Sequence, residues 1–308
     1  MIAWPPPGAE AAQGGRVRSL ILILFVVFSS ACGATREMAV RSLISPMRLP
    51  LLGSPQAPHR DITFTTTDGL KLEGWLFEPQ RPSLGLVVLL HGKDANRGHF
   101  AEDAVRFTKR GYTVLAYDQR AHGRSEGQWC TFGIKEVPDL QLALDLYAGE
   151  NPVYLIGESM GAAVALEAAA RDPRIAGVVA GASFSDLRTI VKEHQPFFMN
   201  DVSLAAAVHD AETRAGFRID DVQPAREALD IQVPTLLLHG SDDPYIAPRH
   251  SYRIRHNLNG PNARFVTMTG VQHIDVLLHE EAWQIIESWF DTISGPRPAP
   301  APVLVNLR

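Results

Sequence analysis

The sequence is poor in cysteine and has no excess of basic residues, and both shortages exclude classes of protein. Two cysteines among 308 residues argue against a disulfide framework, even in an exported protein. Neither cysteine stands in a spacing that binds zinc, and the eleven histidines are scattered, so we expect no metal and no cofactor. The 29 lysines and arginines are outnumbered by 34 aspartates and glutamates, which argues against a nucleic-acid partner.

A short apolar run near the N-terminus predicts export. It covers residues 20–28, follows Arg16 and Arg18, and leads through small residues to Cys32. A basic flank, a short apolar core and small residues are typical of a secretory signal peptide. The run is too short to span a bilayer comfortably as a helix. We therefore assign residues 1–32 to a signal peptide.

The fate of Cys32 has two open alternatives. Small residues directly before a cysteine resemble a bacterial lipoprotein signal, in which the cysteine is lipidated and becomes the mature N-terminus. This resemblance implies attachment to the membrane of a bacterial cell envelope through an N-terminal lipid. The other alternative is plain secretion after cleavage. In either case Cys130 is left as an unpaired thiol.

The chain between its ends is expected to form one domain, residues 60–294. Residues 33–59 carry four prolines and no sustained apolar period, which indicates a linker or tether. Residues 295–308 are rich in proline and indicate an extended tail. No internal repeat is present, and the oligomeric state is left open.

Within the domain, apolar strand-like runs alternate with helix-like runs. This alternation predicts an α/β fold with a mostly parallel sheet covered by helices on both faces. In such sheets, functional sites gather at the carboxyl ends of the strands. Residues 186–230 are too long for a plain crossover and predict a small helical lid. Its residues 197–199 (Phe-Phe-Met) either line an acyl pocket or pack the lid onto the core.

One serine lies between two glycines where a strand-like run meets an alanine-rich helix. The segment reads Gly157-Glu-Ser159-Met-Gly161. A serine at such a sharp turn is held out at the top of the sheet, and flanking side chains would collide in the turn. The pattern is that of a nucleophile elbow, with Ser159 as the nucleophile.

A serine nucleophile needs a histidine base that is oriented by a carboxylate. Both are expected at later strand ends, in the order serine, acid, histidine. The run "LLLHG" is followed by Asp242 and Asp243, and His273 follows the last strand-like run. The order along the chain fits, and it leaves both acids open.

Five segments together resemble the α/β-hydrolases of the small-lid group, which includes serine aminopeptidase-like hydrolases, monoacylglycerol lipases and related esterases. They read "LLHGKDANRGHF", "AYDQRAHGRSEG", "GESMG", "LLLHGSDDPYIAP" and "GVQHID". The resemblance implies that Asp243, four residues after a histidine, is the acid. It also implies that the backbone N–H groups of Lys93 and Met160 form an oxyanion hole, and that Asp118 and Arg120 brace the site.

The resemblance implies a serine hydrolase that cleaves a small-molecule carboxylic ester through an acyl-serine intermediate. A thioesterase and an aminopeptidase-type amide hydrolase remain open as alternatives. So does a non-catalytic binding module, because a fold does not fix a function. The acyl chain and the leaving group cannot be read from the sequence.

Overall fold

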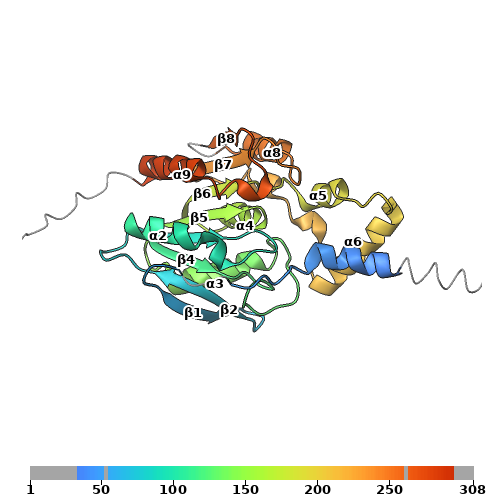
Figure 1. Ribbon diagram of the computed structural model, residues 1–308, viewed down its shortest axis with the longest axis horizontal. Coiled ribbons are helices and arrows are strands. Elements are labelled where there is room, and N and C mark those ends of the chain that lie inside the picture. Colours follow the sequence, from blue (N-terminus) through green and yellow to red (C-terminus); the bar gives the residue numbers. More distant parts are fainter. Residues whose placement is uncertain (1–32, 52–54, 260–262, 295–308) are drawn as a thin grey trace, which may run out of the picture.

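The computed structural model describes residues 33–51, 55–259 and 263–294, and these residues are built around one central sheet (Figure 1). Its eight strands follow the apolar runs of the sequence. They are β1 (Arg60–Thr65), β2 (Lys71–Phe77), β3 (Leu86–Leu90), β4 (Thr113–Tyr117), β5 (Val153–Glu158), β6 (Ile175–Gly181), β7 (Thr235–Gly240) and β8 (Arg264–Met268).

The strand order across the sheet is β1-β2-β4-β3-β5-β6-β7-β8. The hairpin of β1 and β2 turns at Gly69, whose φ of 88° favours glycine, and β2 pairs antiparallel with β4. The pairs from β4 through β8 are parallel. The α/β prediction with a mostly parallel sheet is therefore confirmed.

Helices cover both faces of the sheet. On one face, α2 (Ala101–Lys109) and α9 (Glu280–Ile293) pack against Val87 and Leu89 of β3. On the other, α3 (Glu136–Tyr147), α4 (Met160–Ala169) and α8 (Arg249–Asn257) share a cluster with Val88 and Leu90. Because alternate side chains of a strand point to opposite faces, β3 must be apolar throughout, and all five of its residues are buried.

The insert over residues 186–230 is helical and lies at one end of the molecule (Figure 1). It contains α5 (Leu187–Glu193), α6 (Asp201–Ala215), η2 (Ile219–Asp221) and α7 (Pro224–Glu227). The side chains of Asp186 and Asn200 cap α5 and α6 by accepting backbone N–H groups. Between these two helices, Met199 is buried in the lid core, whereas Phe197 is 99% exposed. Neither expectation for the Phe-Phe-Met segment therefore holds for Phe197.

The prediction of a tether over residues 33–59 is wrong for its first part. Residues 33–44 form a helix, here called the N-terminal helix, which packs beside α6 (Figure 1). Its Val40 and Ile44 lie one turn apart and are fully buried. Its Glu37 pairs with Arg214 of α6 at 2.7 Å. Two apolar residues on one helical stripe, together with charges that match α6, were enough to dock the segment.

The predicted signal peptide with Cys32 and the proline-rich tail both lie outside the described residues. Within the described ranges, none of the helices combines the length and apolar character needed to cross a bilayer. Cys130 is buried and unpaired within the same ranges.

Candidate active site

Ser159 lies at the sharp turn from β5 to α4. Its φ of 53° and ψ of −115° are strained for a residue with a side chain. Its N–H donates to the carbonyl of Gly181 at 2.8 Å, which helps to hold the strain. A Cβ added to Gly157 would lie 2.3 Å from the Gly161 carbonyl oxygen, and one added to Gly161 would lie 2.0 Å from the Leu90 carbonyl oxygen. Only glycine fits at either position.

The structure brings Ser159, His273 and Asp243 together from three strand ends. His273 opens η3 (His273–Asp275) beyond β8, and Asp243 follows β7. The Ser159 Oγ lies 3.0 Å from Nε2 of His273, and Nδ1 of His273 lies 2.7 Å from Oδ2 of Asp243. Asp242 is exposed and instead accepts a hydrogen bond from the Ser241 hydroxyl at 2.6 Å. The geometry therefore separates the two neighbouring acids.

The Asp243 carboxylate is buried but well supplied with donors. Its Oδ1 accepts the backbone N–H groups of Tyr245 and Ile246 at 2.9 and 2.8 Å. Burial opposes its ionisation, but contacts from His239 and His273 outweigh burial and hold the pKa of Asp243 well below its usual range. An ionised Asp243 accepts the Nδ1–H of His273, which leaves Nε2 free to accept the hydroxyl proton of Ser159.

Two backbone N–H groups lie where an oxyanion hole is expected. The N–H of Met160 is in the first turn of α4 and has no intrahelical acceptor. The N–H of Lys93 meets no acceptor among the described residues. Gly92 lies so close to Ser159 that an added Cβ would be 3.4 Å from the serine Cβ. Both donors therefore lie beside the serine.

The loop that carries Lys93 is fixed from inside by His91. The Gly92 carbonyl accepts from Nδ1 of His91 at 2.8 Å, and the Gln119 N–H donates to its Nε2 at 3.0 Å. This pattern defines a neutral imidazole with the proton on Nδ1. Burial lowers the pKa of His91 to about 3, which is consistent with that state.

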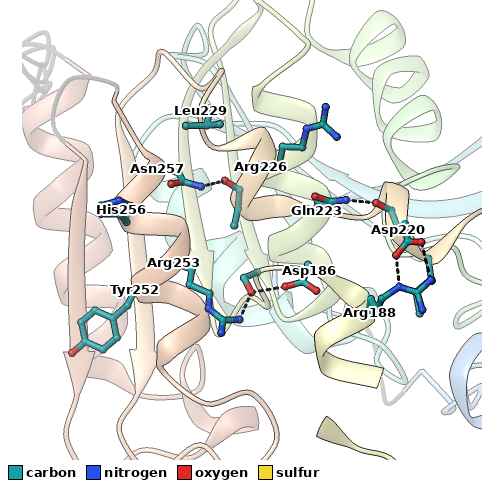
Figure 2. A pocket seen from close by; sticks show the side chains of 13 residues that line it. Asp186, Arg188, Asp220, Gln223, Arg226, Leu229, Tyr252, Arg253, His256 and Asn257 are labelled. Carbon is teal, nitrogen blue, oxygen red and sulfur yellow. Dashed lines mark hydrogen bonds and ion pairs between the residues drawn. The ribbon is translucent and has the colours of Figure 1, made fainter. Parts of the chain in front are cut away.

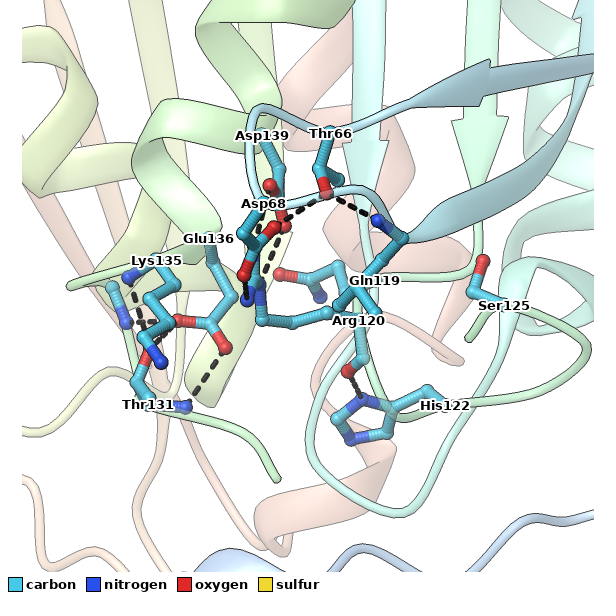
Figure 3. Close-up of polar contacts among 12 residues, drawn as sticks. Thr66, Asp68, Gln119, Arg120, His122, Ser125, Thr131, Lys135, Glu136 and Asp139 are labelled. Atoms are coloured by element: carbon cyan, nitrogen blue, oxygen red, sulfur yellow. Dashed lines mark hydrogen bonds and ion pairs between the residues drawn. The ribbon is translucent and has the colours of Figure 1, made fainter. Parts of the chain in front are cut away.

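Buried ion pairs brace the loop after β4. Arg120 pairs with Asp139 at 2.7 Å and with Asp68 at 2.9 Å, which ties this loop to α3 and to the β1–β2 turn (Figure 3). Asp118 accepts the backbone N–H of Arg97 and its guanidinium, at 2.7 and 2.5 Å. Neither Asp118 nor Arg120 contacts Ser159 through any of these bonds, so both act as braces.

Sequence reasoning missed a buried ion pair beside the serine. Glu158 precedes Ser159, and its Oε2 lies 2.9 Å from Nε2 of His99 in η1 (Arg97–Phe100). Burial opposes protonation of His99, but Glu158 outweighs burial and raises the pKa of that imidazole. The pair joins the elbow to the segment after the Lys93 loop. No periodicity signals it, because its partners come from unrelated elements.

A second serine–histidine–acid chain was also missed. The Ser185 Oγ lies 2.8 Å from Nδ1 of His250, whose Nε2 lies 3.1 Å from Glu193. This serine follows a sheet strand without an elbow, and its backbone N–H also donates to Nδ1 of His250 at 3.1 Å. Glu193 is further paired with Arg249 at 2.7 Å. The chain ties the lid helix α5 to β6 and α8.

A hollow of about 750 Å³ opens beside Ser185, between α5, α7 and α8 (Figure 2). Its lining includes Arg253, Asn257 and Gln223, but not Ser159, Asp243 or His273. This hollow is therefore separate from the candidate active site. Among the described residues, no group of three or more histidine, cysteine, aspartate or glutamate side chains is arranged to hold a metal ion.

Comparisons with known proteins agree with this geometry. The profile of the family described as "Serine aminopeptidase, S33" matches residues 81–211. The fold superposes on an esterase of Pyrococcus furiosus, Pf2001, with a TM-score of 0.67 and 25% identity, over 82% of this chain and all of that one. The chain belongs to the α/β-hydrolase superfamily.

Relatives of this α/β-hydrolase differ in their activities. The mouse lysophosphatidylserine lipase ABHD12 is 26% identical over 204 residues, which cover 62% of this chain and 49% of that protein. The polyketide transferase ATR5 of Stachybotrys chlorohalonatus is 34% identical over 136 residues, or 42% of this chain and 46% of that protein. The esterase- and lipase-like relatives support hydrolase activity, and they imply a small-molecule substrate.

Proposed function

We propose that the chain is a serine hydrolase that cleaves a carboxylic ester through an acyl-serine intermediate. One observation carries the proposal: Ser159, His273 and Asp243 form a continuous hydrogen-bonded chain, with distances of 3.0 and 2.7 Å, at the carboxyl edge of the sheet. A serine hydroxyl is a weak nucleophile by itself, and an oriented imidazole removes its proton as it attacks.

The reaction then follows from the positions of the groups. The Ser159 Oγ attacks the ester carbonyl carbon while His273 Nε2 takes its proton. The carbonyl oxygen becomes an oxyanion, which accepts the N–H groups of Lys93 and Met160. His273 returns the proton to the departing alcohol oxygen, and the acyl group remains on Ser159. Water, deprotonated by the same imidazole, releases the acid and restores the serine.

An ester is favoured over an amide by the names of the similar proteins, which include an esterase and a lipase. The family profile is named for an aminopeptidase, so amide cleavage is the second candidate. The two differ in the leaving group, because an amine must be protonated before it departs, whereas an alcohol leaves more easily. A panel of p-nitrophenyl esters and aminoacyl p-nitroanilides distinguishes them by relative kcat/KM.

Labelling with a fluorophosphonate probe tests the mechanism. The wild-type protein is expected to react at Ser159, which mass spectrometry of the labelled peptide locates. Ser159→Ala is expected to lose labelling and to lower kcat by about 10³-fold or more, because nothing replaces the hydroxyl. Ser185→Ala is the matched control, since Ser185 also contacts a histidine, and it should still be labelled at Ser159. Labelling at Ser185 in place of Ser159 would refute the proposal.

A further inference from the structure

The segment that follows the N-terminal helix crosses the outer side of the Lys93 loop. This segment, residues 45–51, is here called the strap. The backbone N–H of Met47 donates to Oδ1 of Asp94 at 2.6 Å. The side-chain amide of Asn96 donates to the Leu49 carbonyl at 3.1 Å. The strap therefore holds the two residues that flank Ala95, directly after Lys93.

The strap also holds a second loop through one side chain. The Arg48 guanidinium donates to the backbone carbonyls of Gly123, Ser125 and Gly127, at 3.1, 2.6 and 2.6 Å. A planar guanidinium suits several carbonyls at once, and a charged donor strengthens each bond. One arginine of the strap thus fixes the loop over residues 123–127.

These two loops meet at one buried carboxylate. Asp118 accepts the N–H of Arg97, which ends the first loop, at 2.7 Å. It also accepts the N–H of Arg124 in the second loop, at 2.8 Å. Asp118 is fully buried, so it ties the loops on their inner side while the strap ties them on their outer side. The Lys93 loop is held between these two attachments.

The strap is itself anchored next to the other oxyanion donor. Ile44, the last residue of the N-terminal helix, accepts the N–H of Cys130 at 2.9 Å. Val40 and Ile44 share a buried cluster with Met160 and Ala163 of α4. The same N-terminal segment therefore packs against the helix that supplies one donor and bonds to the loop that supplies the other.

We propose that the strap is a positioning element of the oxyanion hole, in which Arg48 and the Asn96–Leu49 bond hold the Lys93 N–H at its working distance from Met160. The inference rests on the proposed function. Because the oxyanion exists only in the transition state and the intermediate, a displaced donor lowers kcat and leaves ground-state binding unchanged. A displacement of about 1 Å is enough to cost on the order of 10²-fold.

The first test is Arg48→Ala in the full-length protein, measured on the best p-nitrophenyl ester. We expect kcat to fall about 10- to 100-fold while KM stays within about 3-fold. Affinity for a trifluoromethyl ketone, whose hemiketal mimics the oxyanion, should fall in parallel with kcat. Arg48→Lys should recover part of kcat. Arg41→Ala is the matched control, because Arg41 is an exposed arginine of the same segment whose side chain bonds only to Glu37, at 2.7 Å.

A second variant avoids dependence on one substitution. Asn96→Asp keeps the oxygen that accepts the Gly98 N–H at 3.0 Å, but removes the amide that donates to Leu49. It should show the same loss of kcat with an unchanged KM. Should Arg48→Ala and Asn96→Asp both retain the kcat of Arg41→Ala, the strap has no positioning role. A fall in thermal stability without a selective loss of ketone affinity would also overturn it. Failure of the hydrolase mechanism itself would appear separately, as absent labelling of Ser159 in the wild-type protein.

Discussion

Replacing Asp243 by asparagine should abolish most activity without unfolding the protein. The carbonyl oxygen of the new side-chain amide can take the place of Oδ1 and accept the N–H groups of Tyr245 and Ile246, which Asp243 binds at 2.9 and 2.8 Å. The amide nitrogen then faces His273 in the place of Oδ2. Because an amide nitrogen donates and cannot accept, Nδ1 of His273 must become the acceptor, and the proton moves to Nε2.

The size of the effect follows from this change of tautomer. An Nε2 that carries a proton cannot take another from Ser159, so general-base catalysis is lost. We expect kcat to fall by about 10⁴-fold, which is about 5.4 kcal/mol of transition-state stabilisation. The exposed Asp242 bonds only to the Ser241 hydroxyl and to backbone, so Asp242→Asn should change kcat by less than about 3-fold.

The assay is steady-state hydrolysis of a p-nitrophenyl ester by both variants, with the rate of fluorophosphonate labelling as a second measurement. Labelling also needs an activated Ser159, so it should slow in Asp243→Asn alone. Far-ultraviolet circular dichroism and a melting curve check that both variants are folded. If Asp242→Asn is the inactive variant and Asp243→Asn is not, the identification of the acid is wrong.

Three further predictions concern separate parts of the chain. Lys93→Ala should retain activity within about 5-fold, whereas Lys93→Pro, which removes the backbone N–H, should lower kcat by about 10²-fold or more in the same ester assay. Burial raises the pKa of Asp103 to about 7, so the fold favours its protonated form and loses stability as the pH rises from about 4 towards 7. Asp103→Asn should therefore raise the free energy of unfolding, on the order of 2 kcal/mol more at pH 8 than at pH 5, and urea titrations at both pH values would show otherwise if the carboxyl titrates normally. We also propose that the protein is exported and held at a bacterial membrane through lipidated Cys32; Cys32→Ser should then move it from the membrane fraction to the soluble exported fraction, and a wild-type protein that is already soluble would exclude the anchor.

The parts of the site that the sequence predicted are those with local signals. Strands buried on both faces leave continuous apolar runs, and their ends are marked by a change to polar residues. Ser159 and His273 lie at such ends, and so does the acid. The two glycines of the elbow follow from the crowding of the turn, since an added Cβ would meet backbone within 2.3 Å at either one. The choice between Asp242 and Asp243 needed the spacing known from the family.

The features that the sequence did not predict depend on contacts between distant segments. The second serine–histidine–acid chain joins three elements that are 65 and 57 residues apart. Phe197 shows the opposite failure, because an aromatic residue in a lid favours burial and the structure exposes it almost completely. Hydrophobic pattern alone does not distinguish a lid residue that packs from one that faces outward.

The N-terminal segment shows why a domain boundary is hard to place from pattern. A cluster of buried residues joins Val40 and Ile44 of the N-terminal helix with Met160 of the elbow and with Ala207 and Ala211 of α6. Each contributing segment is too short, or too rich in small residues, to show a sustained apolar period by itself. The cluster exists only once all three are in place, so its stability is shared between them. Residues 33–51 therefore belong to the folded domain. A boundary at residue 60, which the proline pattern indicates, would remove the strap from the Lys93 loop and uncover the packing around Met160.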